Sequence, residues 1–179
     1  MNKILKEILS TSVYLLVVLL ITYLIVNFVG QRTEVVGSSM ESTLSDGDNL
    51  IVDKITYRFK EPERYDIIVF PFQYAKNTYY IKRIIGMPGE TIRIDSDGVI
   101  YINDKELTEF YGKEVIDDPG IARNDITLGK DEYFVMGDNR NNSTDSRDPS
   151  VGNIRKKDIL GRAWLRIWPL YEFELLTDN

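Results

Sequence analysis

The chain of 179 residues carries a net charge of -6 and contains neither histidine nor cysteine. The absence of cysteine excludes disulfides, thiol nucleophiles and thiolate metal sites, and the absence of histidine removes the commonest neutral metal ligand. We therefore predict no metal and no cofactor, and a hydrolase built on this chain cannot use imidazole as its base. Basic residues are scattered among acidic ones, which predicts no nucleic-acid partner.

The first predicted element is an apolar helix at residues 8–29, rich in Val, Leu and Ile. At about 1.5 Å per residue this run reaches about 30 Å, the thickness of the hydrocarbon core of a bilayer. We predict a transmembrane anchor in the lipid bilayer, preceded by a short cytoplasmic N-terminus at residues 1–7. Lys3 and Lys6 precede the run and Arg32 follows it. This lysine bias predicts a single-pass protein whose remaining residues are extracytoplasmic.

Two alternatives exist for this segment. A cleaved signal peptide has the same general form, but the apolar run is longer than a typical signal-peptide core, and residues 27–32 lack a clean small-x-small cleavage site. A buried core helix is the second alternative. The length of the run and its position near the N-terminus favour an anchor over both.

Residues 30–179 are predicted to form one β-rich domain of curled antiparallel sheets. Short segments rich in β-branched and aromatic residues alternate with turns that contain Pro, Gly, Asp and Ser. The more polar residues 103–130 are predicted to be an inserted strand pair or an excursion rather than a second domain. The predicted strands cover residues 49–53, 66–70, 78–85, 91–94, 99–102, 133–136 and 163–167.

Two segments of this domain suggest a catalytic pair. Residues 37–44 read GSSMESTL and contain Ser39, and residues 80–90 read YIKRIIGMPGE and contain Lys82. A serine hydroxyl is a weak nucleophile until a base takes its proton, and a lysine is a base only when it is neutral. The pKa of that lysine must therefore lie about 2 to 3 units below its ordinary value of about 10.4, which burial among apolar side chains can achieve.

The alternation of the predicted strand places Tyr80, Lys82 and Ile84 on one face. If Tyr80 and Ile84 are buried, Lys82 between them is desolvated. The alternative is an ordinary strand lysine with its ammonium group in water. Ser39 likewise has an alternative, because the serine-rich sequence around it is typical of a plain polar turn.

A third segment, GDNRNNSTDSR at residues 137–147, adds polar candidates. Its D-x-N start suggests a calcium loop, but Arg140 occupies an early ligand position and no glycine stands at the sixth, so the EF-hand pattern fails. Asp145 and Arg147 are predicted to form an ion pair. Ser143 is a candidate to donate to, or to orient, the lysine nitrogen.

Taken together, these segments resemble the type I signal peptidases, the membrane-bound serine endopeptidases that remove signal peptides, and in particular the short Gram-positive bacterial kind. The resemblance implies Ser39 as nucleophile and Lys82 as general base. It implies Ser143 as the serine that hydrogen-bonds the lysine amine, and Asp145 and Arg147 as a supporting pair. The matching blocks after the anchor are residues 35–44, 47–54, 80–90 and 133–147.

The resemblance also implies a fold, a location and a substrate. The expected fold is a β-rich catalytic domain with an apolar surface near a bacterial cell membrane. The expected partners are secretory preproteins, cleaved after small residues and aligned by pairing with an edge strand. The residues expected to shape the small-residue pockets, which are equally compatible with core positions, are Val35, Met40, Leu44, Tyr80 and Ile81.

Three positions depart from the family pattern. Ser42 stands where a proline is usual, which is expected to loosen the turn by about 1 kcal/mol through the unfolded state without removing a catalytic group. Glu90 replaces an aspartate in a turn. Gly37 lacks a hydroxyl that some relatives direct at the oxyanion, so the backbone N–H of Ser39 is expected to carry more of that stabilisation, with a second donor unidentified.

Two rival functions remain open. The first is a non-catalytic accessory protein of pilus or secretion assembly on the same scaffold, which is expected to lose the serine or the lysine. The second is a self-cleaving repressor with a serine and a lysine, against which the predicted anchor argues.

Overall fold

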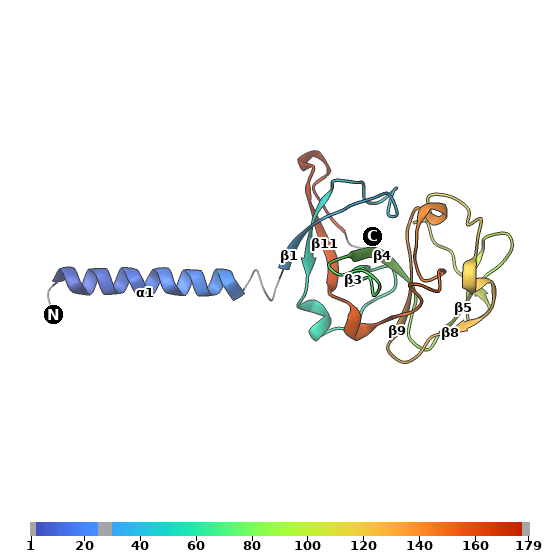
Figure 1. The fold of residues 1–179 in the computed structure, drawn as a ribbon, viewed down its shortest axis with the longest axis horizontal. Coiled ribbons are helices and arrows are strands. Elements are labelled where there is room, and N and C mark those ends of the chain that lie inside the picture. Colours follow the sequence, from blue (N-terminus) through green and yellow to red (C-terminus); the bar gives the residue numbers. More distant parts are fainter. Residues whose placement is uncertain (1–2, 25–29, 177–179) are drawn as a thin grey trace.

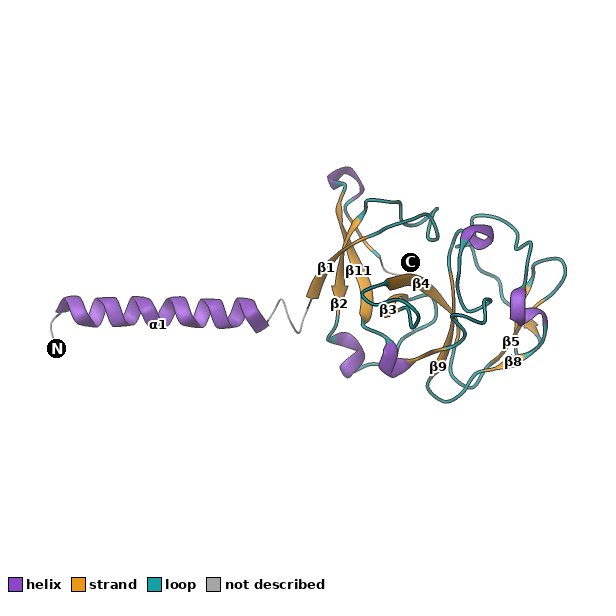
Figure 2. Cartoon of the chain, viewed as in Figure 1, coloured by secondary structure: helices purple, strands orange, loops and turns teal. Residues whose placement is uncertain are grey.

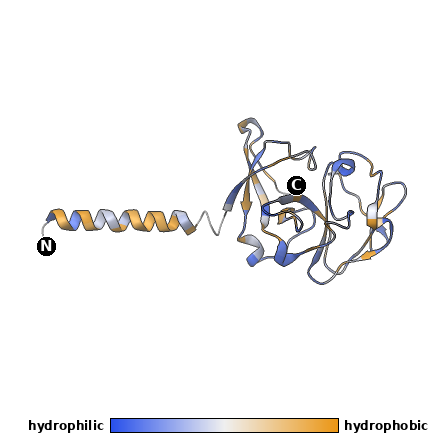
Figure 3. Cartoon of the chain, viewed as in Figure 1, coloured by the Kyte–Doolittle hydropathy of each residue, from blue (hydrophilic) through white to orange (hydrophobic). Residues whose placement is uncertain are grey.

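The computed structural model describes residues 3–24 and 30–176. Its first element is the helix α1, Lys3–Leu24, drawn apart from the β-rich domain in Figure 1. None of the residues of α1 is buried by the rest of the chain, although most of them are apolar, as Figure 3 shows. By its 22 residues and its composition, α1 is long and apolar enough to cross a membrane.

The start of α1 differs from the prediction. The helix begins at Lys3 rather than at residue 8, because lysine, glutamate and leucine near the N-terminus are good helix formers even where the hydropathy is low. The prediction followed hydropathy and missed this first part. The predicted residues 25–29 lie outside the described residues.

The larger sheet has eight strands in the order β1-β2-β11-β3-β4-β9-β10, with β12 paired to β11. Its pairings are antiparallel, and irregularities in β4 and β11 bend the sheet. Its strands are β1 Gly30–Glu34, β2 Asn49–Asp53, β3 Ile67–Pro71, β4 Tyr79–Gly86, β9 Glu132–Met136, β10 Ile154–Arg155, β11 Gly161–Trp168 and β12 Glu174–Leu175.

The smaller sheet has four strands in the order β7-β6-β5-β8. These are β5 Thr91–Ile94, β6 Ile100–Ile102, β7 Lys105–Glu106 and β8 Ile126–Thr127. The polar residues 103–130 therefore supply two strands, but β7 and β8 pair with β6 and β5 and not with each other. Among the described residues, short 3₁₀ helices lie in the loops and are coloured purple in Figure 2: η2 Thr56–Arg58, η3 Gly120–Arg123, η4 Arg140–Asn142, η5 Lys156–Asp158 and η6 Leu170–Glu172.

The prediction of a mainly β, antiparallel fold is confirmed. All seven predicted strands are present, and those at 49–53 and 91–94 have the predicted ends. The prediction missed β1, β10 and β12, and it gave no positions for β7 and β8 within residues 103–130. β1 reads GQRTE and is largely exposed at the sheet edge, so it carries no apolar alternation from which a strand can be predicted.

The strand β4 passes through the centre of the core. Ile81 packs on a cluster that includes Met40 and Leu44. Ile84 belongs to a second buried cluster, and Ile85 to a third cluster that the two sheets share. Because apolar clusters surround β4, a polar side chain on this strand is removed from water.

Candidate active site

Ser39 lies in the loop between β1 and β2. Backbone hydrogen bonds between Val35 and Asp48, and between Gly47 and Val35, close this loop at its base. Met40 follows Ser39 and is buried in the core. The backbone N–H of Asn139 donates to the Ser39 carbonyl oxygen at 3.1 Å. The serine is therefore held by packing on one side and by the segment 137–147 on the other.

The structure brings Ser39 and Lys82 together across 43 residues of sequence. Lys82 Nζ lies 2.7 Å from Ser39 Oγ, and a second hydrogen bond from Nζ reaches the carbonyl oxygen of Ile81 at 3.0 Å. This separation is within the range over which a hydroxyl can pass its proton to a base.

The environment of Lys82 is apolar. The residue is 3% exposed, and Nζ lies 5.1 Å from the centre of the Tyr80 ring. Burial lowers the pKa of Lys82 from 10.5 to about 8, against the opposing attraction of Asp145 and Asp138 for its charge. The alternative of a strand lysine with its ammonium group in water is wrong.

The predicted ion pair of Asp145 and Arg147 is present. Arg147 donates from Nε and Nη2 to the two carboxylate oxygens of Asp145, each at 2.9 Å. Asp145 also accepts from the backbone N–H of Gly137 at 3.0 Å. A Cβ at Gly137 would lie 2.4 Å from the Ser39 carbonyl oxygen, so only glycine permits this close approach.

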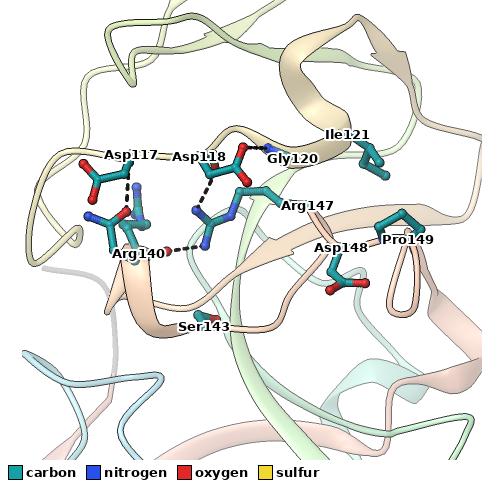
Figure 4. A pocket seen from close by; sticks show the side chains of 10 residues that line it. Asp117, Asp118, Gly120, Ile121, Arg140, Ser143, Arg147, Asp148 and Pro149 are labelled. Atoms are coloured by element: carbon teal, nitrogen blue, oxygen red, sulfur yellow. Dashed lines mark hydrogen bonds between the residues drawn. The ribbon is translucent and has the colours of Figure 1, made fainter.

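Ser143 does not make the predicted hydrogen bond to Lys82. Its Oγ is buried and has no hydrogen-bond partner within the part of the chain that the structure describes. Oγ packs instead against Gly137, where a Cβ would lie 2.3 Å from it. Figure 4 shows Ser143 with Arg140 and Arg147 around a cavity of about 500 Å³.

A second buried ion pair was missed by the sequence analysis. Arg83 donates from Nε and Nη2 to Asp138 at 2.9 and 2.7 Å, and both side chains are almost fully buried. Thr43 Oγ1 donates to the same carboxylate at 2.6 Å, and the Tyr111 ring lies 3.7 Å from the guanidinium carbon. The sequence did indicate that Arg83 lies on the face of a central strand opposite to the face that carries Lys82. The acid that pairs with it could not be chosen from sequence.

A cleft of about 640 Å³ opens beside the pair. One wall runs along residues 33–40 and the other along residues 77–82. Because β9 pairs with β4 only from Arg83 onward, the other edge of residues 79–82 lies open along the cleft. Of the five predicted pocket residues, Val35, Met40, Tyr80 and Ile81 line this cleft.

Leu44 is the exception among the predicted pocket residues. It is 0% exposed and packs in the same apolar cluster as Leu50 and Ile67. Leu44 does not line the cleft, and its burial in this cluster corresponds to the core position that the sequence equally allowed.

Ser42 adopts a backbone conformation that proline cannot adopt. Its φ is 89°, whereas a proline ring holds φ near -65°. The loop from Met40 to Thr43 is a turn whose third residue needs a positive φ. The expected effect of losing a proline therefore does not apply to this turn. Glu90, the second departure, accepts from the Met87 N–H at 2.8 Å and pairs with Arg64.

No cluster of three or more metal-ligating side chains occurs among residues 3–24 and 30–176. In the segment 137–147, whose D-x-N start suggests a calcium loop, Arg140 instead forms an ion pair with Glu109 at 2.7 Å.

Comparison with known proteins gives the family. The family profile described as "Signal peptidase, peptidase S26" matches residues 7–168. The probable signal peptidase I-2 of Synechocystis sp. is 42% identical over 157 residues, which cover 85% of this chain and 69% of that protein. Signal peptidase I P of Bacillus subtilis subsp. natto is 37% identical over 163 residues, which cover 87% of this chain and 86% of that protein. Signal peptidase IB of Staphylococcus aureus is 31% identical, with 94% of both chains covered.

A crystal structure of a signal peptidase I from Enterococcus faecalis V583 covers 57% of this chain and 97% of its own, with 32% identity and a TM-score of 0.47. The family assignment depends on the profile and the sequence relatives. They define the chain as a peptidase and therefore as a hydrolase. It belongs to the type I signal peptidases of peptidase family S26.

Proposed function

We propose that this protein is a membrane-anchored serine endopeptidase that cleaves signal peptides from secretory preproteins after small residues. Ser39 is the nucleophile and Lys82 the general base. The observation that carries the proposal is the 2.7 Å contact between Ser39 Oγ and a lysine amine that is 3% exposed. A lysine with a pKa of about 8 is partly neutral near neutral pH and competent to accept a proton.

The chemical steps follow from this contact. Neutral Lys82 accepts the Ser39 proton while Oγ attacks the scissile carbonyl carbon. The protonated lysine then gives its proton to the leaving amine, which releases the mature protein and leaves the signal peptide as an ester on Ser39. Lys82 next takes a proton from water while the water oxygen attacks the ester carbonyl carbon. The bond to Ser39 Oγ then breaks, Oγ takes the proton back from Lys82, and the signal peptide leaves with a free carboxyl terminus.

The developing oxyanion needs hydrogen-bond donors that are already in place. The backbone N–H of Ser39 is the donor we assign. Gly37 has a φ of 95° and offers no hydroxyl. The tight turn around Ser39, closed by the bond from the Glu41 N–H to the Ser38 carbonyl oxygen, orients the backbone of the nucleophile.

The substrate is proposed to bind as an extended strand in the cleft. The open edge of residues 79–82 offers backbone groups for pairing, and residues 33–40 form the opposite wall. Val35, Met40, Tyr80 and Ile81 limit the size of the side chains that fit next to the scissile bond. This confinement supports a preference for small residues.

The three supporting residues are proposed to position Ser39 and Lys82. Asp145, fixed by Arg147, holds the Gly137 backbone against Ser39. We keep Ser143 in the proposal as the hydroxyl that orients the lysine during the reaction. Its buried and unpartnered Oγ is free to take on such a hydrogen bond.

Anchoring and orientation complete the proposal. The part of α1 from residue 8 onward belongs to the single transmembrane segment, residues 1–7 are cytoplasmic, and the β-rich domain of residues 30–179 faces the outside of a bacterial cell membrane. A cluster of exposed apolar side chains on the hairpin of β11 and β12 supports a position near the bilayer. These are Trp164, Trp168, Leu170, Tyr171, Phe173 and Leu175.

The accessory-protein alternative has no observation in its favour, because Ser39 and Lys82 are both present and in contact. A self-cleaving protein is separated from a preprotein peptidase by incubating the purified chain alone.

The decisive experiment is cleavage of a preprotein with Ala at the two recognition positions by the full chain in detergent. We expect cleavage at the small-residue site by the wild type and none by Ser39→Ala or Lys82→Met. Retention of most activity by Lys82→Met would refute the assignment of the base. Failure of the well-folded wild type on several preproteins, over a range of pH, would favour the accessory protein.

A further inference from the structure

A basic and aromatic projection follows β2. We define the knuckle as Arg58, Phe59 and Lys60, all three exposed. Phe59 is 82% exposed, although it is large and apolar. The knuckle is rigidly presented, because the N–H groups of Phe59 and Lys60 both donate to the Thr56 carbonyl oxygen at 2.9 Å. Asp53 in turn accepts from the Thr56 N–H and hydroxyl.

Three lysines add positive charge at the knuckle and beside it. Lys54, Lys60 and Lys157 take part in none of the salt bridges among the described residues. Two neighbouring acids are already engaged, since Glu61 pairs with Lys156 at 2.6 Å and Asp158 pairs with Arg155 at 2.8 Å.

Lys54, Lys157 and Asp158 border one cleft. A cleft of about 920 Å³ separates η2 from η5. Its charged lining consists of Lys54, Arg58, Lys156 and Lys157, with Asp131 and Asp158 as the acids. A local excess of cations in a chain of net charge -6 needs an explanation. The knuckle and cleft lie at the opposite end of β2 from the exposed aromatic hairpin, because Trp168 pairs with Asn49 and Arg162 with Asp53.

The chain path places this region close to the end of α1. Asp53, which precedes the knuckle, is paired in register with Gly30 at the start of β1. Gly30 lies six residues after Leu24, the last residue of α1, and six residues span at most about 20 Å. Figure 1 shows the helical turn after β2 at the side of the domain where β1 begins.

We propose that the knuckle and the lysines beside it bind the surface of an anionic phospholipid bilayer. Phe59 inserts at the boundary between headgroups and acyl chains, while Lys54, Lys60 and Lys157 contact lipid phosphates. An aromatic ring between cations suits this boundary, because the ring is buried while the charged ends stay among the headgroups. The inference rests on the proposed membrane anchor. Attachment at α1 and at the knuckle restricts rotation of the domain and keeps the catalytic cleft at a fixed distance from the bilayer surface.

The absence of native cysteine allows a direct test on the full chain. Three single variants, Phe59→Cys, Phe110→Cys and Leu16→Cys, are spin-labelled in nanodiscs of phosphatidylglycerol or of phosphatidylcholine. Phe110 is the matched control, being 92% exposed, and Leu16 reports on the anchor. We expect the label at 59 to be shielded several-fold from a water-soluble relaxation agent in phosphatidylglycerol, less so in phosphatidylcholine. The label at 110 stays accessible, and the label at 16 lies in hydrocarbon.

The outcomes separate the two proposals. If the label at 16 lies in hydrocarbon while the label at 59 is as accessible as that at 110, the knuckle proposal is wrong and the anchor stands. If the label at 16 is itself in water, both proposals fail. Charge reversal in Phe59→Cys, by Lys54→Glu, Lys60→Glu and Lys157→Glu together, is expected to remove the shielding at 59 without changing cleavage in detergent. Unchanged shielding would overturn the role of anionic lipid.

Discussion

Lys82 and Arg83 are consecutive residues of β4, and each is 3% exposed. Arg83 meets a carboxylate in a two-pronged ion pair, and its charge is neutralised where it is buried. Lys82 meets only a hydroxyl and a carbonyl oxygen, so burial lowers its pKa to about 8. The comparison shows that one strand can bury two basic side chains that serve different roles. A partner acid makes Arg83 structural, whereas Lys82, which contacts no acid among the described residues, is suited to the role of base that we propose.

The largest expected effect comes from Lys82→Met. We expect cleavage to fall by at least about a thousand-fold, because the base is lost. The free energy of unfolding should rise by up to about 3 kcal/mol, because a pKa shift from 10.5 to about 8 measures the cost of burying this charge. Cleavage assays and thermal unfolding test both, with Ser39→Ala as an inactive control that keeps the buried lysine. Lower stability of Lys82→Met would contradict the desolvated site.

The neighbouring substitution Arg83→Met should act in the opposite way on stability. It leaves Asp138 buried without its partner, and we expect a loss of about 3 to 5 kcal/mol. Denaturant unfolding is the measurement. The double variant Arg83→Met with Asp138→Leu should recover much of this loss, since no charge is then left unpaired. Equal loss in the single and double variants would mean that the pair contributes by packing alone.

The pH dependence sharpens the same comparison. The base form of Lys82 increases as pH rises through about 8, so kcat/KM should rise with pH and level off above this value. Between about 8 and 10.5 the unfolded chain binds more protons at Lys82 than the folded chain, so stability from this group increases with pH. Subtracting the free energy of unfolding of Lys82→Met from that of the wild type, at each pH, isolates the contribution of Lys82, because the two proteins share all other titrating groups. A difference that does not change with pH would contradict the shifted lysine.

Ser143→Ala tests the proposed orienting hydroxyl. Removing a buried hydroxyl that has no partner should raise stability by about 1 kcal/mol. If Ser143 orients Lys82 during the reaction, kcat should fall by roughly ten-fold with little change in KM. Steady-state kinetics beside thermal unfolding measures both. Full activity would restrict Ser143 to packing against Gly137.

The smallest expected effect concerns the loop that carries Ser39. Because Ser42 has a φ of 89°, Ser42→Gly should stabilise the protein by about 1 kcal/mol, and Ser42→Pro should destabilise it despite the usual proline of the family. Thermal unfolding of the two variants gives the sign of each change. A stabilising proline would show that the loop adopts another conformation.

Much of the fold was predictable from local patterns. The central strands were found because β-branched runs between Pro and Gly turns are typical of buried strands. β1 was missed because its residues are polar and exposed at the sheet edge. The pair of Ser39 and Lys82 was proposed from the chemistry left to a chain without histidine and from the family resemblance. Arg83 and Asp138 were not paired, because sequence gives no distance between residues 55 positions apart.

By itself, the sequence determined the residue types available for chemistry, the apolar run at the N-terminus, the strand-rich class and the resemblance to the signal peptidases, because all four are written in composition and short-range pattern. Only the tertiary structure decided that Lys82 is buried against Ser39, that Asp138 pairs with Arg83 and not with Lys82, that Leu44 lies in the core, and that the Ser143 hydroxyl has no hydrogen-bond partner among the described residues. The physical reason is that burial and pairing depend on which distant strands pack together, whereas propensity and alternation depend on neighbours along the chain.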